Sequence, residues 1–377
     1  MRAYYFLLIT MGFHAAAGQT AKPAVQAGAA EFLRAGVAAQ EHGDNRSAIE
    51  NFRKALALQP KMVEARAGLG EALAATGQFD EAIAQDLQAL AGAPDKNAVR
   101  MNLATAYFKK NDLANARVQG ERVHAAAPSD IAAAVLLGSI YIKMGREAEA
   151  VDLLAPLEQG HETDMELEYM LGFGLIQTGR DKEGVPRMEK VAQARHLASA
   201  YLIAGASHLH NGEMEGARAD LDAAMKLDPR IPGLATMAGQ ARYAMKDMAA
   251  AATAFQVALR ADPADPTANL DLGAIRLTEG DYENARPLLE LALQLQPTLP
   301  LARMEMAKLD VITGHYVEAA AILEELVKAE PNWADAHWEL ASVYAELNHP
   351  AEGRRERMIA QELRAKAQDA AGDHSKQ

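Results

Sequence analysis

Prolines recur along the chain at intervals of 34 residues, and this period constrains the fold more than any other feature of the sequence. Four of them end similar hexapeptides, namely ALALQP, AMKLDP, ALRADP and ALQLQP. Because proline has no backbone N–H and disfavours a helical residue before it, each is expected to end a helix. A period of this length predicts a solenoid of stacked units instead of separate domains. These prolines are Pro60, Pro94, Pro128, Pro229, Pro263, Pro297 and Pro331, and the gap from Pro128 to Pro229 is three periods less one residue.

Two positions of each period carry only small residues. With residue 29 counted as position 1, positions 8 and 20 are glycine or alanine in every period. Two antiparallel helices can approach closely only where no large side chain separates them. Larger residues at positions 7 and 24, such as Leu69 and Phe52, fill the space beside that contact, and Gly or Asn near position 15 favours a turn. Each period is therefore predicted to be a pair of antiparallel helices.

This pattern resembles the tetratricopeptide repeat, a 34-residue unit with Gly or Ala at position 8, Ala at position 20 and Pro at position 32. The resemblance implies an all-α fold, a right-handed α-solenoid (superhelix) of tandem helix-turn-helix repeats. Pro156 lies inside the second helix of the fourth repeat and should shorten it, which predicts one continuous solenoid with an irregular joint near residues 155–165. The array spans residues 29–367, and its ten repeats are 29–62, 63–96, 97–130, 131–164, 165–197, 198–231, 232–265, 266–299, 300–333 and 334–367.

Both ends of the chain are predicted to lie outside the repeats. The segment MRAYYFLLITMGFHAAAGQT has one arginine, an apolar stretch from Ala3 to Phe13 and small residues at 15–17, which is typical of a secretory signal peptide. We predict a signal peptide at 1–17, cleaved near Ala17, with an uncleaved anchor as the alternative, and a short linker at 18–28. The protein would then be exported, periplasmic or secreted, with no membrane span after cleavage. Residues 368–377 are predicted to be a disordered tail.

Composition excludes several classes of function. Lys and Arg number 38 against 51 Asp and Glu, and a net charge of −13 argues against non-specific nucleic-acid binding. Cysteine is absent, which excludes disulfides, thiolate metal sites and cysteine nucleophiles.

No motif of the sequence indicates catalysis. The glycines fall at repeat positions and form no phosphate-binding loop. His208 and His210 are two residues apart, so on a helix they point about 200° from each other and cannot share a metal ion. Asp262 and Asp265 lie in a predicted loop, where capping of the next helix by Asp265 is favoured over a cation site. We therefore predict a protein that is not an enzyme and that needs no cofactor and no metal.

The family resemblance also implies a binding surface, because first-helix residues at positions 2, 5, 9 and 12 line the concave groove of such arrays. In this chain many of these residues are apolar. Burial between neighbouring repeats is the favoured interpretation at positions 5 and 12, and a groove that receives an apolar peptide or helix is the alternative. The predicted groove residues are Met101, Phe108, Val135, Ile142, Tyr169, Phe173, Ile176, Leu202, Leu209, Tyr243, Leu270 and Trp338.

The expected function is a non-catalytic, exported protein-binding scaffold or adaptor that docks a peptide segment or helix of a protein partner in this groove. Envelope assembly or secretion is a setting suggested by analogy with the fold alone. The alternative is a self-associating structural protein, which leaves a homo-oligomer open. A substrate-binding arm of an enzyme is the least favoured function, because the repeats leave no room for a catalytic domain. The basic cluster Arg354, Arg355 and Arg357 is interpreted as part of a solvated capping helix.

Overall fold

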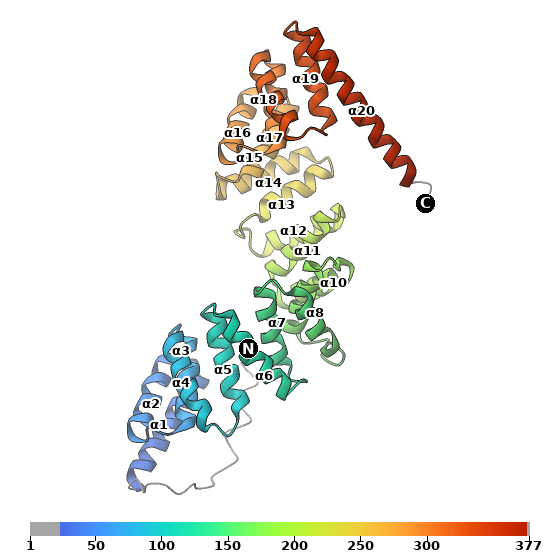
Figure 1. Cartoon of the computed structure of the whole chain (residues 1–377). Helices are drawn as coiled ribbons and strands as arrows, with labels where there is room; N and C mark the ends of the chain where they lie inside the picture. The colour runs from blue at the N-terminus through green and yellow to red at the C-terminus, as the bar shows by residue number, and fades with distance from the viewer. Residues whose placement is uncertain (1–22, 375–377) are drawn as a thin grey trace. The chain divides into compact units, whose positions relative to one another are not determined.

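A computed structural model describes residues 23–374, and regular structure within this range is helical throughout (Figure 1). The predicted signal peptide and residues 375–377 lie outside the described residues. The helices are α1 (Pro23–Glu41), α2 (Asn45–Leu58), α3 (Val63–Ala75), α4 (Phe79–Gly92), α5 (Lys96–Lys109), α6 (Leu113–Ala126), α7 (Ile131–Lys143), α8 (Glu147–Leu154), α9 (Met165–Gln177), α10 (Asp181–Arg195), α11 (Ala198–His210), α12 (Met214–Leu227), α13 (Leu234–Ala244), α14 (Met248–Ala261), α15 (Pro266–Thr278), α16 (Tyr282–Leu295), α17 (Pro300–Ile312), α18 (Tyr316–Ala329), α19 (Ala334–Glu346) and α20 (Pro350–His374).

Each 34-residue window holds one pair of consecutive helices. The turn between the two helices has a residue with positive φ at position 15 in every window, for example Gly77 with φ 82°. The pairs end where proline prevents continuation, as at Pro60 after α2. Pro156 has the expected effect, because α8 ends at Leu154 and gives way to a short 3₁₀ segment, Ala155–Leu157. Asp265 caps α15 as predicted, since its carboxylate accepts hydrogen bonds from the backbone N–H groups of Thr267 and Ala268, both at 3.0 Å.

The two ends of the array differ from the sequence-based expectation. Helix α1 includes residues 23–28, which we expected to be linker, because proline is tolerated in a first turn and the segment leads directly into the alanine-rich residues that follow. Helix α20 continues through His374, so residues 368–374 are helical and not disordered. The segment after residue 367 contains alanines and no proline that would stop the helix.

The small residues at position 8 allow the helices of a pair to pack. A Cβ atom added to Gly239 on α13 would lie 2.5 Å from the ring of Phe255 on α14, far inside van der Waals contact. Phe255 is fully buried and occupies position 24. The same arrangement holds for Gly36 and Phe52 in the first pair, where the distance would be 2.6 Å. Only glycine at position 8 leaves space for these aromatic side chains.

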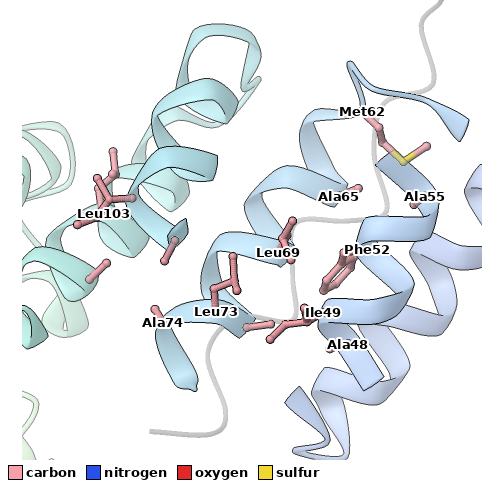
Figure 2. Packing of buried hydrophobic residues seen from close by; sticks show 14 of the residues in the cluster. Ala48, Ile49, Phe52, Ala55, Met62, Ala65, Leu69, Leu73, Ala74 and Leu103 are labelled. Atoms are coloured by element: carbon pink, nitrogen blue, oxygen red, sulfur yellow. The ribbon is translucent and has the colours of Figure 1, made fainter. Parts of the chain in front are cut away.

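The hydrophobic core consists of a series of clusters, most of which join residues of two or three consecutive helices. In the N-terminal cluster, Ile49 and Phe52 of α2 lie against Leu69 and Leu73 of α3 (Figure 2). Leu103 of α5 belongs to the same cluster, so the core continues from one repeat into the next.

The chain divides into two compact units, with the boundary between Thr178 and Gly179. We call the part up to Thr178 unit 1 and the part from Gly179 unit 2. The boundary lies in the turn between α9 and α10, inside the fifth window, and not at residues 155–165 where we expected the irregular joint. Pro156 shortens α8, but α8 still packs against α9, so the array continues past that proline.

Within each unit the first helices of neighbouring repeats pack side by side. In unit 1 the order is α1, α3, α5, α7 and α9, and in unit 2 it is α11, α13, α15, α17 and α19. We refer to the surface made by these helices as the first-helix face of each unit. Within residues 23–374, no helix combines the length and the apolar character needed to span a membrane.

Candidate functional site

The predicted groove residues of unit 1 fall into a buried and a half-buried set. Met101 is buried with Val123 and Ala133 at the contact between repeats, and Val135 is buried in a cluster with Leu171. These two side chains belong to the core and are not available to a partner. The half-buried set is Phe108 on α5, Ile142 on α7, and Tyr169, Phe173 and Ile176 on α9.

The half-buried set defines an apolar strip on the first-helix face of unit 1. We call Phe108, Ile142, Tyr169, Phe173 and Ile176 the apolar strip. Its members come from three first helices that pack side by side in chain order. The strip has a polar border, because the ammonium group of Lys143 lies 5.0 Å from the centre of the Phe108 ring and Lys143 itself is exposed. A surface of this kind offers aromatic and aliphatic contacts with a cation at one edge.

The predicted groove residues on α11, α13 and α15 of unit 2 are buried or packed against neighbouring helices, which leaves less of their surface for a partner. Leu270 is buried in the cluster formed with α16 and α17. Leu202, Leu209 and Tyr243 are half-buried and pack against neighbouring helices. These residues serve the contact between repeats, as the burial interpretation expects for positions 5 and 12.

Trp338 on α19 is covered from within unit 2. The guanidinium groups of Arg357 and Arg364, both on α20, lie 5.4 Å and 4.8 Å from the centre of its ring. Such stacking satisfies the indole face within the chain. Arg357, which we had interpreted as a solvated residue of the capping helix, thus also contacts Trp338.

A buried carboxyl group lies in the second repeat of unit 1, against the first helix α3. Asp86 on α4 is 0% exposed, and neither of its carboxylate oxygens has a hydrogen-bond partner. Burial, together with the nearby charge of Glu71, raises the pKa of Asp86 from 3.8 to about 8, and the side-chain amide of Asn102 opposes this shift. A Cβ atom on Gly70 would overlap with this carboxylate. Asp86 is therefore a neutral acid at pH 7, held against a glycine of the preceding helix.

Sequence reasoning missed Asp86, although a signal was present. The residue occupies position 24, where seven other repeats have a large apolar side chain that fills the pair. An acidic residue in a position that is large and apolar in seven of the ten repeats marks a departure from the packing rule. The residues at position 24 in those seven repeats are Phe52, Leu154, Met188, Leu221, Phe255, Leu289 and Leu323.

Comparison with protein families identifies one family. A family profile described as tetratricopeptide repeat matches residues 33–98, 77–131 and 236–300, and a second profile of the same description matches residues 276–342. Together the matches span more than half of the chain. The unmatched segment between them contains two of the repeats that lack the terminal proline, one of which is also one residue short. A comparison with curated protein sequences found no match.

Several solved structures are similar to this chain in fold. The crystal structure of MamA is 17% identical, with a TM-score of 0.39, and the match covers 44% of this chain and 96% of that one. MamA from Desulfovibrio magneticus RS-1, residues 41 to the end, is 20% identical with a TM-score of 0.41, covering 45% and 96%. The Cut9–Hcn1 hetero-tetramer of the APC/C is 14% identical with a TM-score of 0.47, covering 89% and 73%.

Proposed function

The chain belongs to the tetratricopeptide repeat family, and from this premise we propose that it is a protein-binding scaffold that docks a partner segment on the apolar strip of unit 1. Tetratricopeptide repeat proteins act as protein-interaction scaffolds, and the fold indicates no catalytic family. Arrays of this kind bind their ligands along the surface that stacked repeats create. The occupant proposed here is a helix or extended peptide with apolar side chains.

One observation carries this proposal: aromatic and aliphatic side chains remain half-exposed on three neighbouring first helices of unit 1. In unit 1, the packing residues Met101 and Val135 of the same helix faces are buried, whereas the side chains of the apolar strip keep part of their surface exposed. Aromatic residues that are accessible at their edges are the usual anchors of a protein interface. Phe173 occupies position 9, which points further from the neighbouring repeat than positions 5 and 12 do. An amphipathic helix laid across these three helices would bury the strip.

The first experiment is site-specific cross-linking in the mature chain. A photoreactive phenylalanine analogue replaces Phe173 in one protein and Leu87 in another. Leu87 is an apolar residue of the second helix α4 and is 49% exposed, so it offers a matched position away from the first-helix face. In an envelope extract, we expect a protein cross-linked through position 173 and not through position 87. The same products at both positions would contradict docking on the strip.

A paired substitution then tests the contribution of the strip to affinity. Tyr169→Ser with Phe173→Ser removes two aromatic anchors, and Leu58→Ser with Leu87→Ser removes two apolar residues from the second helices as a control. We expect the first pair to weaken capture of the cross-linked partner by at least about tenfold and the control pair to leave capture unchanged. Circular dichroism spectra and melting curves establish that both proteins fold. Equal capture by all three proteins would refute the proposed site.

We further propose that the protein is exported, with residues 1–17 as its signal peptide. The order of one arginine, an apolar stretch and small residues supports this proposal. The intact mass of the protein expressed with its leader distinguishes the alternatives. A chain that begins at Gly18 in the periplasm or the medium indicates cleavage, and a chain that keeps Met1 in the membrane fraction indicates an anchor.

Self-association is the second candidate function, favoured by apolar residues exposed in unit 2. Ile312 and Val317 are 52% and 68% exposed and lie on either side of the turn between α17 and α18. Exposed aliphatic residues at one end of a helix pair can form a contact between two copies. Multi-angle light scattering over a range of concentrations tests this candidate. A mass that rises with concentration, and that returns to the monomer value in Ile312→Ser with Val317→Ser, would support it.

A further inference from the structure

Three side chains from three helices converge in unit 2. Glu189 lies on α10, His208 on α11 and Asp220 on α12. Nε2 of His208 is 3.5 Å from Oε1 of Glu189 and 3.6 Å from Oδ2 of Asp220, and one ligand atom from each residue lies within 4.8 Å of the others. His208 is largely buried, and Glu189 is more exposed. The cluster thus has a buried side and an open side.

The imidazole of His208 is held in a fixed orientation. Its Nδ1 atom is 2.6 Å from a carboxylate oxygen of Glu213, which precedes α12. Gly216 makes room for the ring, because a Cβ atom there would lie 2.9 Å from ring atoms of His208. With Nδ1–H donating to Glu213, the lone pair of Nε2 faces Glu189 and Asp220. A carboxylate that orients a histidine in this way is the usual outer partner of a metal-binding imidazole.

The buried member of the cluster, Asp220, lacks a hydrogen-bond partner at one carboxylate oxygen. Asp220 is 6% exposed, and its Oδ2 atom accepts no hydrogen bond, although it is the atom that faces His208. Buried carboxylate oxygens are almost always paired, and an unpaired one costs folding free energy. If Nε2 of His208 carried a proton, its distances of 3.5 and 3.6 Å to the oxygens of Glu189 and Asp220 would both be longer than a well-formed hydrogen bond. A cation between the three groups would satisfy them all.

The spacing of the cluster fits a small metal ion. For Zn²⁺ with ligands at 2.0–2.2 Å in a tetrahedron, neighbouring ligand atoms are separated by roughly 3.3–3.6 Å. The two contacts of Nε2, at 3.5 and 3.6 Å, match this separation, and the ligand atoms of Glu189 and Asp220, which lie within 4.8 Å of each other, would complete the site after a small movement of the more exposed Glu189 side chain. We propose that Glu189, His208 and Asp220 form a Zn²⁺ site that joins α10 to the helix pair α11–α12, with the fourth position open to water on the side of Glu189.

The donor set distinguishes this ion from the common hard cations. One imidazole nitrogen and two carboxylate oxygens suit Zn²⁺, whereas Mg²⁺ and Ca²⁺ prefer oxygen ligands in larger numbers. The sequence-based argument considered only the pair His208 and His210, which lie on one helix. That argument could not find ligands supplied by α10 and α12, because their approach depends on how the helices pack.

Metal titration of the full chain tests the site. The protein is treated with a chelator, dialysed, and titrated with Zn²⁺ in a calorimeter, and Co²⁺ serves as a spectroscopic probe of tetrahedral geometry. We expect one Zn²⁺ per chain and a Co²⁺ visible spectrum typical of four-coordination. His208→Ala and Asp220→Asn should each lower Zn²⁺ affinity by at least about 100-fold, and Glu213→Gln, which affects a positioning residue, by roughly 10–100-fold.

His210→Ala is the matched control, because His210 lies on the same helix and is exposed. His210→Ala should bind Zn²⁺ like the wild type. Zn²⁺ should raise the melting temperature of the wild type and of His210→Ala but not that of His208→Ala. Far-UV circular dichroism in chelator shows whether each variant is folded, and the conservative Asp220→Asn replaces His208→Ala if the latter is not. Absence of stoichiometric Zn²⁺ binding by the wild type would overturn the proposal, as would equal affinity in the wild type and Asp220→Asn.

Discussion

At the scale of single residues, Asp86 is a buried carboxyl group of unit 1 whose burial is not compensated by hydrogen bonds. Its side chain is fully buried with both oxygens unpaired, and burial raises its pKa from 3.8 to about 8. In the unfolded chain the same carboxyl group ionises near pH 3.9. The folded state therefore binds more protons than the unfolded state between about pH 4 and pH 8, and the free energy of unfolding must fall as pH rises through that range.

Asp86→Asn should remove this pH dependence, because asparagine has nearly the shape of the protonated acid and cannot ionise. We expect the free energy of unfolding of the variant, relative to that of the wild type, to increase by roughly 2–4 kcal/mol from pH 5 to pH 9. Little further change is expected above about pH 9. Urea unfolding at these two pH values measures the difference. Asp152→Asn, at an exposed position of unit 1, is the control and should show no comparable gain. The same difference between Asp86→Asn and the wild type at both pH values would contradict a neutral Asp86.

At the scale of helix pairs, the contact between positions 8 and 24 determines how closely the two helices approach. Gly239→Ala should destabilise unit 2 by roughly 1–3 kcal/mol, because its Cβ atom would lie 2.5 Å from the ring of Phe255. The neighbouring ring of Phe255 is fully buried. Chemical unfolding monitored by circular dichroism gives the change in free energy.

A double-mutant cycle with Phe255→Leu tests the cause. The smaller side chain should relieve the overlap, so the cost of Gly239→Ala should be lower in the Phe255→Leu background by about 1 kcal/mol or more. The turn residue Gly314 is the control, because a Cβ atom added there would meet no atom within 4 Å. Its positive φ of 80° makes alanine there costly through backbone strain alone, so Phe255→Leu should leave that cost unchanged. Additive effects of Gly239→Ala and Phe255→Leu would exclude the proposed contact.

The helix pairs could be predicted from the sequence because their determinants are local and repeated. A small residue at position 8, a proline at position 32 and a turn residue at position 15 recur with one period, and each has a single physical meaning. The turn at Lys246 could not be predicted in this way, because lysine rarely adopts the positive φ of 65° found there. The surrounding pair imposes this conformation where the sequence offers no glycine or asparagine.

The candidate sites could be predicted only in part. Repeat positions suggested the residues of the apolar strip, but they could not separate Tyr169, which is half-buried, from Val135, which is buried at the same position 5, since that depends on the neighbouring repeat. The cluster of Glu189, His208 and Asp220 requires three helices to meet. Its residues are far apart in sequence and follow no family motif, so only the packed structure brings them together.

At the scale of the whole molecule, the division at Thr178 and Gly179 has consequences for unfolding. Arrays of repeats are stabilised by contacts between neighbours, so two compact units can unfold in separate steps. Both tryptophans of the chain, Trp333 and Trp338, lie in unit 2. Tryptophan fluorescence therefore reports unit 2, and far-UV circular dichroism reports the helices of both units.

We expect the two signals to give different urea midpoints at pH 9, because the buried charge of Asp86 weakens unit 1 alone. Asp86→Asn should move the circular dichroism transition towards higher urea and leave the fluorescence transition where it was. A stabilising substitution in one unit that shifts both signals equally would show that the chain unfolds as one cooperative body. The effect of Asp86→Asn on the two signals thus measures how far cooperativity extends along the array. The substitution is in unit 1, whereas tryptophan fluorescence reports unit 2.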